Sequence, residues 1–260
     1  MWGKFQTEFL QYRVGNLMWF GVNILDLAAK IFLWTAIFNN AKSDVLNGFT
    51  LELMIVYLIA NQIVFHLTFL NPQFDMAEDI RMGTIAVKFI KPISYRLQIF
   101  FGSLGHLLGE LCFGILPTSI IFAFYLSLTD IKIGLLSLLL FILSIIVSFI
   151  LNFLIAFCFG MIVFYTKNGF GIMQLKDVVF MLLSGSLIPI DFYPEFAKRI
   201  VDLLPFKQVV YIPISILIGK LQGFEAIKAI SIQALWIVVL FILFDLVWKR
   251  TVKRVVVQGG

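Results

Sequence analysis

Residues 75–92 read DMAEDIRMGTIAVKFIKP and separate two long apolar runs. The segment carries three carboxylates first and then three basic side chains, Arg81, Lys88 and Lys91. Four of its residues recur at spacings of four, three and four, which places them on one helical face: Met76, Ile80, Gly83 and Val87. Glycine costs about 1 kcal/mol in a helix interior, so we expect Gly83 to break or bend this helix. The pattern predicts either a solvated loop with some interfacial helix or a charged lever held between two membrane spans.

The composition around this segment is that of a membrane protein. Of 260 residues, 61% are hydrophobic and only 13% are charged, against about 25% charged in soluble domains. Each span needs about 20 apolar residues. We therefore expect an all-α polytopic membrane protein, a single domain over residues 1–260, with six spans over residues 17–38, 51–70, 107–128, 133–165, 170–188 and 229–247. Residues 1–16 are too short and too polar to span, and they predict an interfacial helix.

The basic residues suggest an orientation. With the N-terminus in the cytoplasm, the cytoplasmic segments hold more Lys and Arg than the external ones, as the positive-inside rule requires. Both termini are therefore expected to be cytoplasmic. The net charge of +5 has the same origin and gives no argument for nucleic acid. The two cysteines, Cys112 and Cys158, lie in apolar runs, so we expect reduced thiols and no disulfide framework.

Five polar residues fall where the membrane is expected. Asp26 and Lys30 are four residues apart in the first span and so share one helical face. They form either a structural ion pair against a neighbouring helix or a polar spot that lines a cavity or a subunit interface. Asn61 suits interhelical hydrogen bonding. His66 suits packing rather than metal binding, and Glu110 falls in the helix that approaches the third span.

The character of the chain changes after Ser184. The sequence Ser184-Gly185-Ser186 precedes prolines at positions 189, 194, 205 and 213, with a short amphipathic piece between them. This region is too broken for an ordinary span and too apolar for a solvated loop. It predicts re-entrant or interfacial half-helices whose backbone is shielded by protein.

Several kinds of chemistry have no sequence support. No Gly-rich phosphate loop, HExxH or paired Cys-x-x-Cys occurs, so hydrolysis of ATP by the Walker type of site is excluded for this chain. Ser184-Gly185 could suggest an intramembrane serine protease, but position 182 is Leu where that motif needs Gly. We expect neither a catalytic nor a metal site.

Taken together, the charged and the proline-rich segments resemble the permease subunits of ABC-2-type transporters, in the subgroup of about 260 residues without a fused ATPase. The resemblance rests on three blocks and covers most of the chain. The blocks are Asp79-Ile80-Arg81-x-Gly83 with Phe89-Ile90-Lys91-Pro92; Leu183-Ser184-Gly185-x-x-Ile188-Pro189 with Phe192-Tyr193-Pro194; and Leu204-Pro205-Phe206 with Tyr211-x-Pro213 and Gly219. A weaker match is Leu33-Trp34-x-Ala36-Ile37-Phe38 with Asn47-Gly48.

The resemblance implies a type V exporter-like fold and a location in the plasma membrane of a bacterial cell. It also implies a second permease, identical or a sister chain, and a pair of separate ATPase subunits that hold the ATP and Mg²⁺, with no cofactor on this chain. The cytoplasmic coupling segment would be residues 75–92, with its site residues Asp75, Met76, Glu78, Asp79, Ile80, Arg81, Gly83, Val87, Lys91 and Pro92. The external gate would be the re-entrant residues 185–213, with Gly185, Pro189, Phe192, Tyr193, Pro194, Pro205, Phe206 and Pro213. Asp26 and Lys30 match no family pattern.

Three other functions remain open at this point. A secondary transporter or channel would couple to ions through Asp26, Lys30 or Glu110. A membrane enzyme would need clustered catalytic groups, which the sequence does not offer. An accessory subunit of a permease pair would share the fold without transporting. Within the exporter interpretation, apolar spans with few charges favour an amphipathic or hydrophobic substrate, such as a peptide, an antibiotic or a lipid-like molecule.

Overall fold

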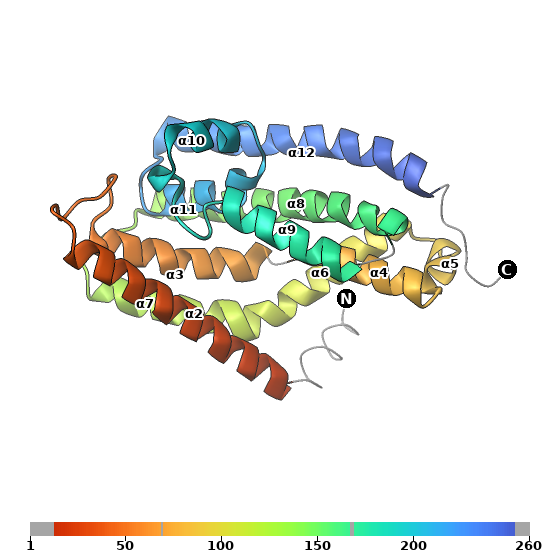
Figure 1. The fold of residues 1–260 in the computed structure, drawn as a ribbon, viewed down its shortest axis with the longest axis horizontal. Coiled ribbons are helices and arrows are strands. Elements are labelled where there is room, and N and C mark those ends of the chain that lie inside the picture. Colours follow the sequence, from red (N-terminus) through yellow and green to blue (C-terminus); the bar gives the residue numbers. More distant parts are fainter. Residues whose placement is uncertain (1–12, 69, 167–168, 253–260) are drawn as a thin grey trace.

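The computed structural model describes residues 13–68, 70–166 and 169–252, which form a bundle of helices along one long axis (Figure 1). The expected interfacial helix over residues 1–16 lies almost entirely outside the described residues. The helices are α2 (Arg13–Asn39), α3 (Leu51–Thr68), α4 (Pro72–Arg81), α5 (Thr84–Phe89), α6 (Tyr95–Glu110), α7 (Leu116–Ser127), α8 (Leu135–Thr166), α9 (Gly169–Leu183), α10 (Glu195–Asp202), α11 (Tyr211–Leu217) and α12 (Gly223–Thr251). A π turn, η2 (Leu111–Ile115), joins α6 to α7, and short 3₁₀ turns η3 (Ile190–Phe192) and η4 (Phe206–Gln208) flank α10.

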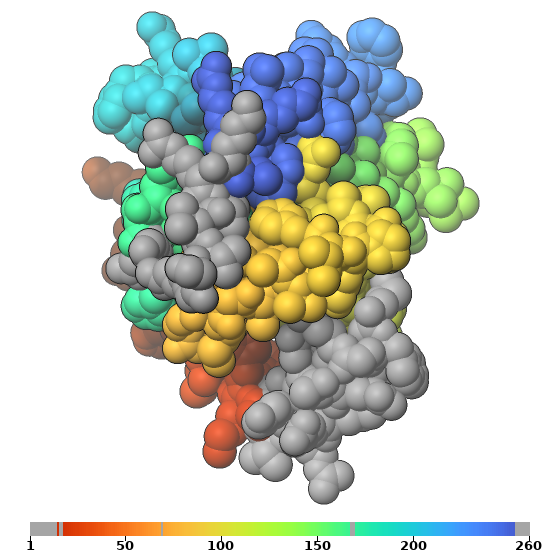
Figure 2. Space-filling model, turned by 90° about the vertical axis from the view of Figure 1, so that its right-hand side faces the viewer, coloured from red at the N-terminus to blue at the C-terminus, as the bar shows by residue number. Residues whose placement is uncertain are grey.

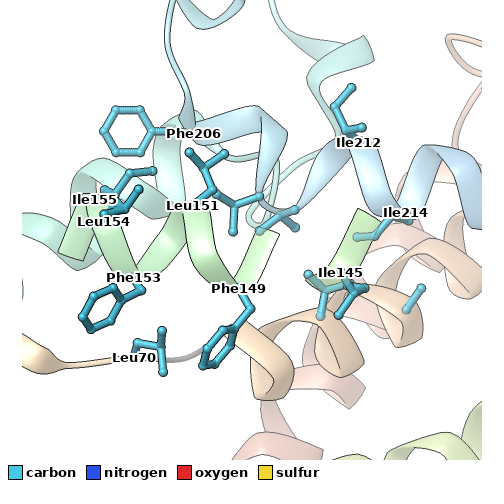
Figure 3. Packing of buried hydrophobic residues seen from close by; sticks show 14 of the residues in the cluster. Leu70, Ile145, Phe149, Leu151, Phe153, Leu154, Ile155, Phe206, Ile212 and Ile214 are labelled. Atoms are coloured by element: carbon cyan, nitrogen blue, oxygen red, sulfur yellow. The ribbon is translucent and has the colours of Figure 1, made fainter. Parts of the chain in front are cut away.

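Helix α8 forms the centre of the bundle. It packs against α3, α4, α9, α11 and α12, and its second half is buried almost continuously. Figure 3 shows Phe149, Phe153 and Leu154 of this helix among apolar side chains from α11 and from Leu70. A helix that is apolar on all sides belongs in the interior of a bundle. Helix α8 has 32 residues, more than one untilted span needs. It contacts α4 at one end of the bundle and α11 at the other.

Five of the six predicted spans are present among the described residues, and the one expected over residues 170–188 is not. Among the described residues, five helical stretches are long and apolar enough to cross a membrane: Met18–Asn39, Leu51–Arg81, Tyr95–Ser127, Leu135–Thr166 and Gly223–Thr251. The pair of α10 with Phe206–Leu217, bent by 80°, makes a sixth if counted as one span. The expected span over residues 170–188 is instead α9, whose 15 residues cover about 22 Å. It stops at Leu183 because Gly185 turns the chain with a φ of 84°.

The long run after Pro92 forms one continuous helical path. The approach helix and the third span expected over residues 107–128 are both parts of the stretch Tyr95–Ser127. The path widens at η2, and Pro117 follows in the first turn of α7. A proline there removes no hydrogen bond of a regular helix interior. Pro117 is therefore accommodated directly after the π turn.

The bundle has two distinct ends. The α4–α5 corner (residues 72–92) occupies one end, and the α10–α11 hairpin (residues 185–217) occupies the other, beside the loop that follows α2 (Figure 1). Viewed from the first end, α4 and α5 fill the middle of the surface next to the end of α12 (Figure 2). These two ends hold the residues that the sequence singled out.

Candidate functional sites at the two ends of the bundle

The α4–α5 corner is set by one glycine. Helix α4 ends at Arg81, and Gly83 adopts a φ of 70° before α5 begins at Thr84. This left-handed conformation is open to glycine at no steric cost and is disfavoured for other L-residues. The prediction that Gly83 breaks the helix is confirmed.

A single buried carboxylate holds the corner together. Three donors converge on Asp79 of α4, whose side chain is 7% exposed. The Lys88 ammonium of α5 lies 2.6 Å from Oδ2, the Tyr95 hydroxyl of α6 lies 2.9 Å from the same oxygen, and the Thr84 hydroxyl lies 2.9 Å from Oδ1. Because a buried charge is stable only when it is paired and hydrogen-bonded, this arrangement fixes three helices relative to one another.

The corner is also joined to α12. The ring of Tyr95 stacks on Trp248 with a centroid distance of 5.8 Å and an interplanar angle of 3°. Arg96 forms an ion pair with Asp245 at 2.9 Å. Sequence reasoning missed these contacts, because Tyr95 and Trp248 lie about 150 residues apart. The one available signal was that Tyr95 and Arg96 closely follow the Pro92 motif.

The predicted common face of the coupling segment is wrong for Met76. Once the helix ends at Arg81, Met76 belongs to α4 and Val87 to α5, and α4 turns Met76 onto α8. Met76 is fully buried, and its Sδ lies 2.6 Å from where a Cβ of Gly160 would stand. Met76 therefore cannot fill a cleft on another protein.

The remaining residues of the coupling segment, residues 75–92, are either partly buried or exposed. Ile80 and Asp75 are half-buried, while Lys91 and Pro92 are exposed in the turn after α5. Arg81 is exposed and pairs with Glu78 on its own helix at 2.7 Å. The exposed apolar side chains are Val87, which was predicted, and two that were not: Met82 and Ile90. Together they form a surface of mixed charge and apolar character at this end of the bundle.

The α10–α11 hairpin begins at the predicted glycine. Gly185 accepts a hydrogen bond at its carbonyl from the buried Tyr57 hydroxyl at 2.7 Å. The Asn61 amide donates to the carbonyl of Ser186 at 2.8 Å. Both donors come from α3, so this helix holds the first turn of the hairpin in place.

The prolines of the hairpin stand where helices start. Pro189, Pro194 and Pro205 directly precede η3, α10 and η4, and Pro213 lies in the first turn of α11. Proline fits these positions because the first turn of a helix leaves its N–H groups unpaired. Phe206 is buried, and α10 is turned by 80° from the segment Phe206–Leu217. Such a bent pair is either a broken span or a re-entrant loop, so the re-entrant arrangement stays a prediction.

Aromatic and polar contacts hold the hairpin against α2 and α9. Phe192 packs with its edge on Trp34 at a centroid distance of 4.9 Å. Asp191, which the sequence did not single out, accepts from the Tyr211 hydroxyl at 2.9 Å and pairs with Lys220 at 2.9 Å. The Tyr193 hydroxyl donates to the carbonyl of Leu182 at 2.7 Å, and burial raises the pKa of this phenol, so it stays protonated as a donor.

Polar residues inside the bundle form separate groups. His66 Nδ1 lies 2.7 Å from Glu110 Oε2, so the two residues that the sequence treated singly form one buried pair. Asp26 and Lys30 form the expected ion pair at 2.6 Å. Gln233 of α12 donates to the carbonyl of Gln208 at 2.6 Å, a buried contact that sequence reasoning missed. Over the described residues, no three His, Cys, Asp or Glu side chains are placed to hold a metal ion.

The helical bundle, with its five long apolar helices among the described residues, defines a polytopic membrane protein. Residues 24–259 match the family described as ABC-2 family transporter protein. The chain therefore belongs to the ABC-2 family of transporter membrane proteins, and the resemblance drawn from its motifs is confirmed. A comparison with curated proteins found no match.

Proposed function

We propose that the chain is the membrane-spanning subunit of an ATP-driven exporter that moves an amphipathic or hydrophobic substrate. ATP and Mg²⁺ would be bound by a pair of separate ATPase subunits, and a second permease would complete the pathway. The observation that carries the proposal is the α4–α5 corner, which is rigidly held by Asp79 and presents exposed charged and apolar side chains at one end of the bundle.

The corner is built to pass on a displacement. Asp79 joins α4 and α5 to α6, and the Tyr95–Trp248 stack with the Arg96–Asp245 pair extends the connection to α12. A partner that pushes on exposed Val87 or Ile90 would therefore move α6 and α12 together. The energy comes from the partner, because a conformational change requires a differential interaction with the two states.

The opposite end supplies a closed exit. The first turn of the hairpin receives side-chain hydrogen bonds from Tyr57 and Asn61 of α3, in addition to contacts within its own segment and with the end of α9. A shift of α3 relative to α8 would break these bonds and release the hairpin. In this account the α4–α5 corner is cytoplasmic, the hairpin is external, and lipids surround the spans.

The test begins with purification from native membranes in mild detergent, followed by mass spectrometry. A stoichiometric ATPase subunit with vanadate-sensitive hydrolysis is the expected result, and the same data show whether a second permease is present. A chain that purifies alone, without ATPase activity under any gentle condition, would contradict the proposal and favour secondary transport. A complex that hydrolyses ATP but exports nothing would favour an accessory subunit.

A charge reversal at the corner tests the coupling role itself. Arg81→Glu should lower substrate-stimulated ATP hydrolysis and export by roughly tenfold or more, on the scale of a lost charge-assisted contact, with the protein still in the membrane. The control is Lys42→Glu in the exposed loop after α2, which should leave both activities unchanged. Normal export by the Arg81 variant would remove this residue from the coupling mechanism.

A further inference from the structure

A cavity of about 460 Å³ lies between four helices of the bundle. Its wall comes from residues 19–30 of α2, the second half of α3, Asn152 of α8 and most of α9. At one end it reaches Ser186 in the first turn of the hairpin, and at the other it reaches Asn71 before α4. The cavity therefore extends from the residue before α4 to the first turn of the hairpin.

The charged groups of the cavity are balanced but unequally accessible. The Lys30 ammonium pairs with Asp26 at 2.6 Å, and the Lys176 ammonium pairs with Asp177 at 2.9 Å. Lys176 is 5% exposed and also donates to the Leu70 carbonyl and to Asn71 Oδ1, each at 3.0 Å. The carboxylates of Asp26 and Asp177 are 49% and 39% exposed. The cavity thus offers carboxylate oxygens more openly than ammonium groups.

Two asparagines of the wall have unused acceptors. Within the part of the chain that the structure describes, Asn61 Oδ1 and Asn152 Oδ1 are buried without a hydrogen-bond partner. The amide nitrogens are already committed, that of Asn61 to the Ser186 carbonyl and that of Asn152 to the Thr68 carbonyl. If either amide were reversed, its oxygen would lie against a carbonyl oxygen, and the two acceptors would repel each other. The orientation of both amides is therefore fixed. A buried acceptor without a donor is costly, and a ligand that brings donors would relieve that cost.

The rest of the wall suits an apolar body with a cationic head. Trp19, Phe65 and Phe180 contribute aromatic rings, and Met173 and Met181 contribute flexible thioethers. Aromatic faces attract ammonium groups, and methionine adapts to varied apolar shapes. These residues come from α2, α3 and α9, so they surround the same volume as the carboxylates.

We propose that this cavity binds an amphiphile whose polar head carries a primary ammonium group, with Asp26 and Asp177 as its ion partners. The ammonium would complete the coordination of the half-exposed carboxylates. Further donors on the head would meet Asn61 and Asn152 as the wall opens around the ligand. This inference deepens the proposed function by naming the substrate class, and its interpretation as export cargo rests on that function. The same chemistry is found in a lipid such as phosphatidylethanolamine and in a cationic peptide or antibiotic.

The test is ligand binding to the full chain in phosphatidylcholine nanodiscs, with tetradecylamine as the probe. Its trimethylammonium counterpart has the same chain and charge but no N–H donor, and it should bind roughly tenfold more weakly. Asp26→Asn and Asp177→Asn should each weaken tetradecylamine binding by roughly tenfold. Asp44→Asn, at an exposed carboxylate in the loop after α2, is the matched control and should bind like the unaltered chain.

Equal binding of the two probes, or unaltered binding by both cavity variants, would overturn the inference. Competition by phosphatidylethanolamine in the nanodisc, without ATP-dependent movement of the probe, would identify a lipid site. ATP-dependent movement of the probe in the ATPase complex would identify cargo. Because binding is measured on the permease itself, a failure to find an ATPase partner leaves this inference standing and removes only the exporter.

Discussion

The α4–α5 corner and the cavity beside α9 both contain carboxylates, but they use them in opposite ways. Asp79 is buried and receives three donors from two other helices, whereas Asp26 is half-exposed and receives one lysine from its own helix. A fully satisfied buried charge fixes geometry, while a partly satisfied one is available to a ligand. The comparison separates a structural hub from a binding position within one chain.

The largest effect is expected from removing the hub. Asp79→Ala leaves the Lys88 ammonium and the Tyr95 hydroxyl without their acceptor, which should cost about 2–3 kcal/mol after discounting for the exposure of Lys88. The measurement is the thermal midpoint of the detergent-purified protein together with its transport activity, and both should fall. Asp44→Ala serves as the control, and an equal response of the two variants would contradict the role assigned to Asp79.

A second substitution breaks the contact between the corner and α8. A Cβ on Gly160 would stand 2.6 Å from Met76 Sδ and 3.2 Å from Gln73 Cα. Gly160→Ala should therefore destabilise the protein by about 1–3 kcal/mol through overpacking, seen as a lower thermal midpoint. In a Met76→Ala background the same Gly160→Ala change should cost less, because the side chain that clashes is removed. An equal cost in the two backgrounds would show that the Gln73 backbone decides the effect.

The turn of the corner gives a smaller effect. Gly83→Ala meets open space but needs a positive φ, so the cost is about 1 kcal/mol or slightly more. Gly21→Ala in α2 also meets open space but has helical geometry, and it should be neutral or stabilising. Thermal midpoints of the two variants provide the comparison. A Gly83 variant as stable as the Gly21 variant would mean that the corner does not depend on this turn.

The smallest effect on stability is expected in the cavity. Asp26→Asn removes an ion pair whose carboxylate is about half exposed, and such pairs contribute about 0–1 kcal/mol. The thermal midpoint should hardly change, in contrast with Asp79→Ala. A large loss of stability would mean that Asp26 is a structural residue like Asp79, and the difference between the two regions would disappear.

The sequence predicted the helices well because their signals are local. The apolar runs predicted the spans, and Gly83 predicted the break between α4 and α5. The prolines marked the positions where the helices of the hairpin start. The prediction failed where a helix ended earlier than its apolar run. Residues 184–188 continue the run of α9, but the turn at Gly185 ends the helix at Leu183.

The candidate sites were predicted only in outline, because their contacts join distant parts of the chain. Asp79 was singled out, but its partner Tyr95 lies 16 residues away and the fold alone brings them together. Met76 does not share a face with Val87, because the periodicity that groups them crosses the break at Gly83. Asp26 and Asp177 line the same cavity because of how α2 and α9 pack. Residue spacing in the sequence cannot predict that packing.

Cross-linking to the ATPase tests the central claim most directly. Cys112 is first replaced by serine and Cys158 by alanine, which removes both native cysteines. A single cysteine is then placed at Ile90, which is 84% exposed on the corner, or, in a second variant, at Leu203, which is 76% exposed beside α10. The account predicts that a short bifunctional reagent joins the ATPase subunit to position 90 and not to position 203. Cross-linking from position 203, or none from position 90 in an active complex, would contradict it.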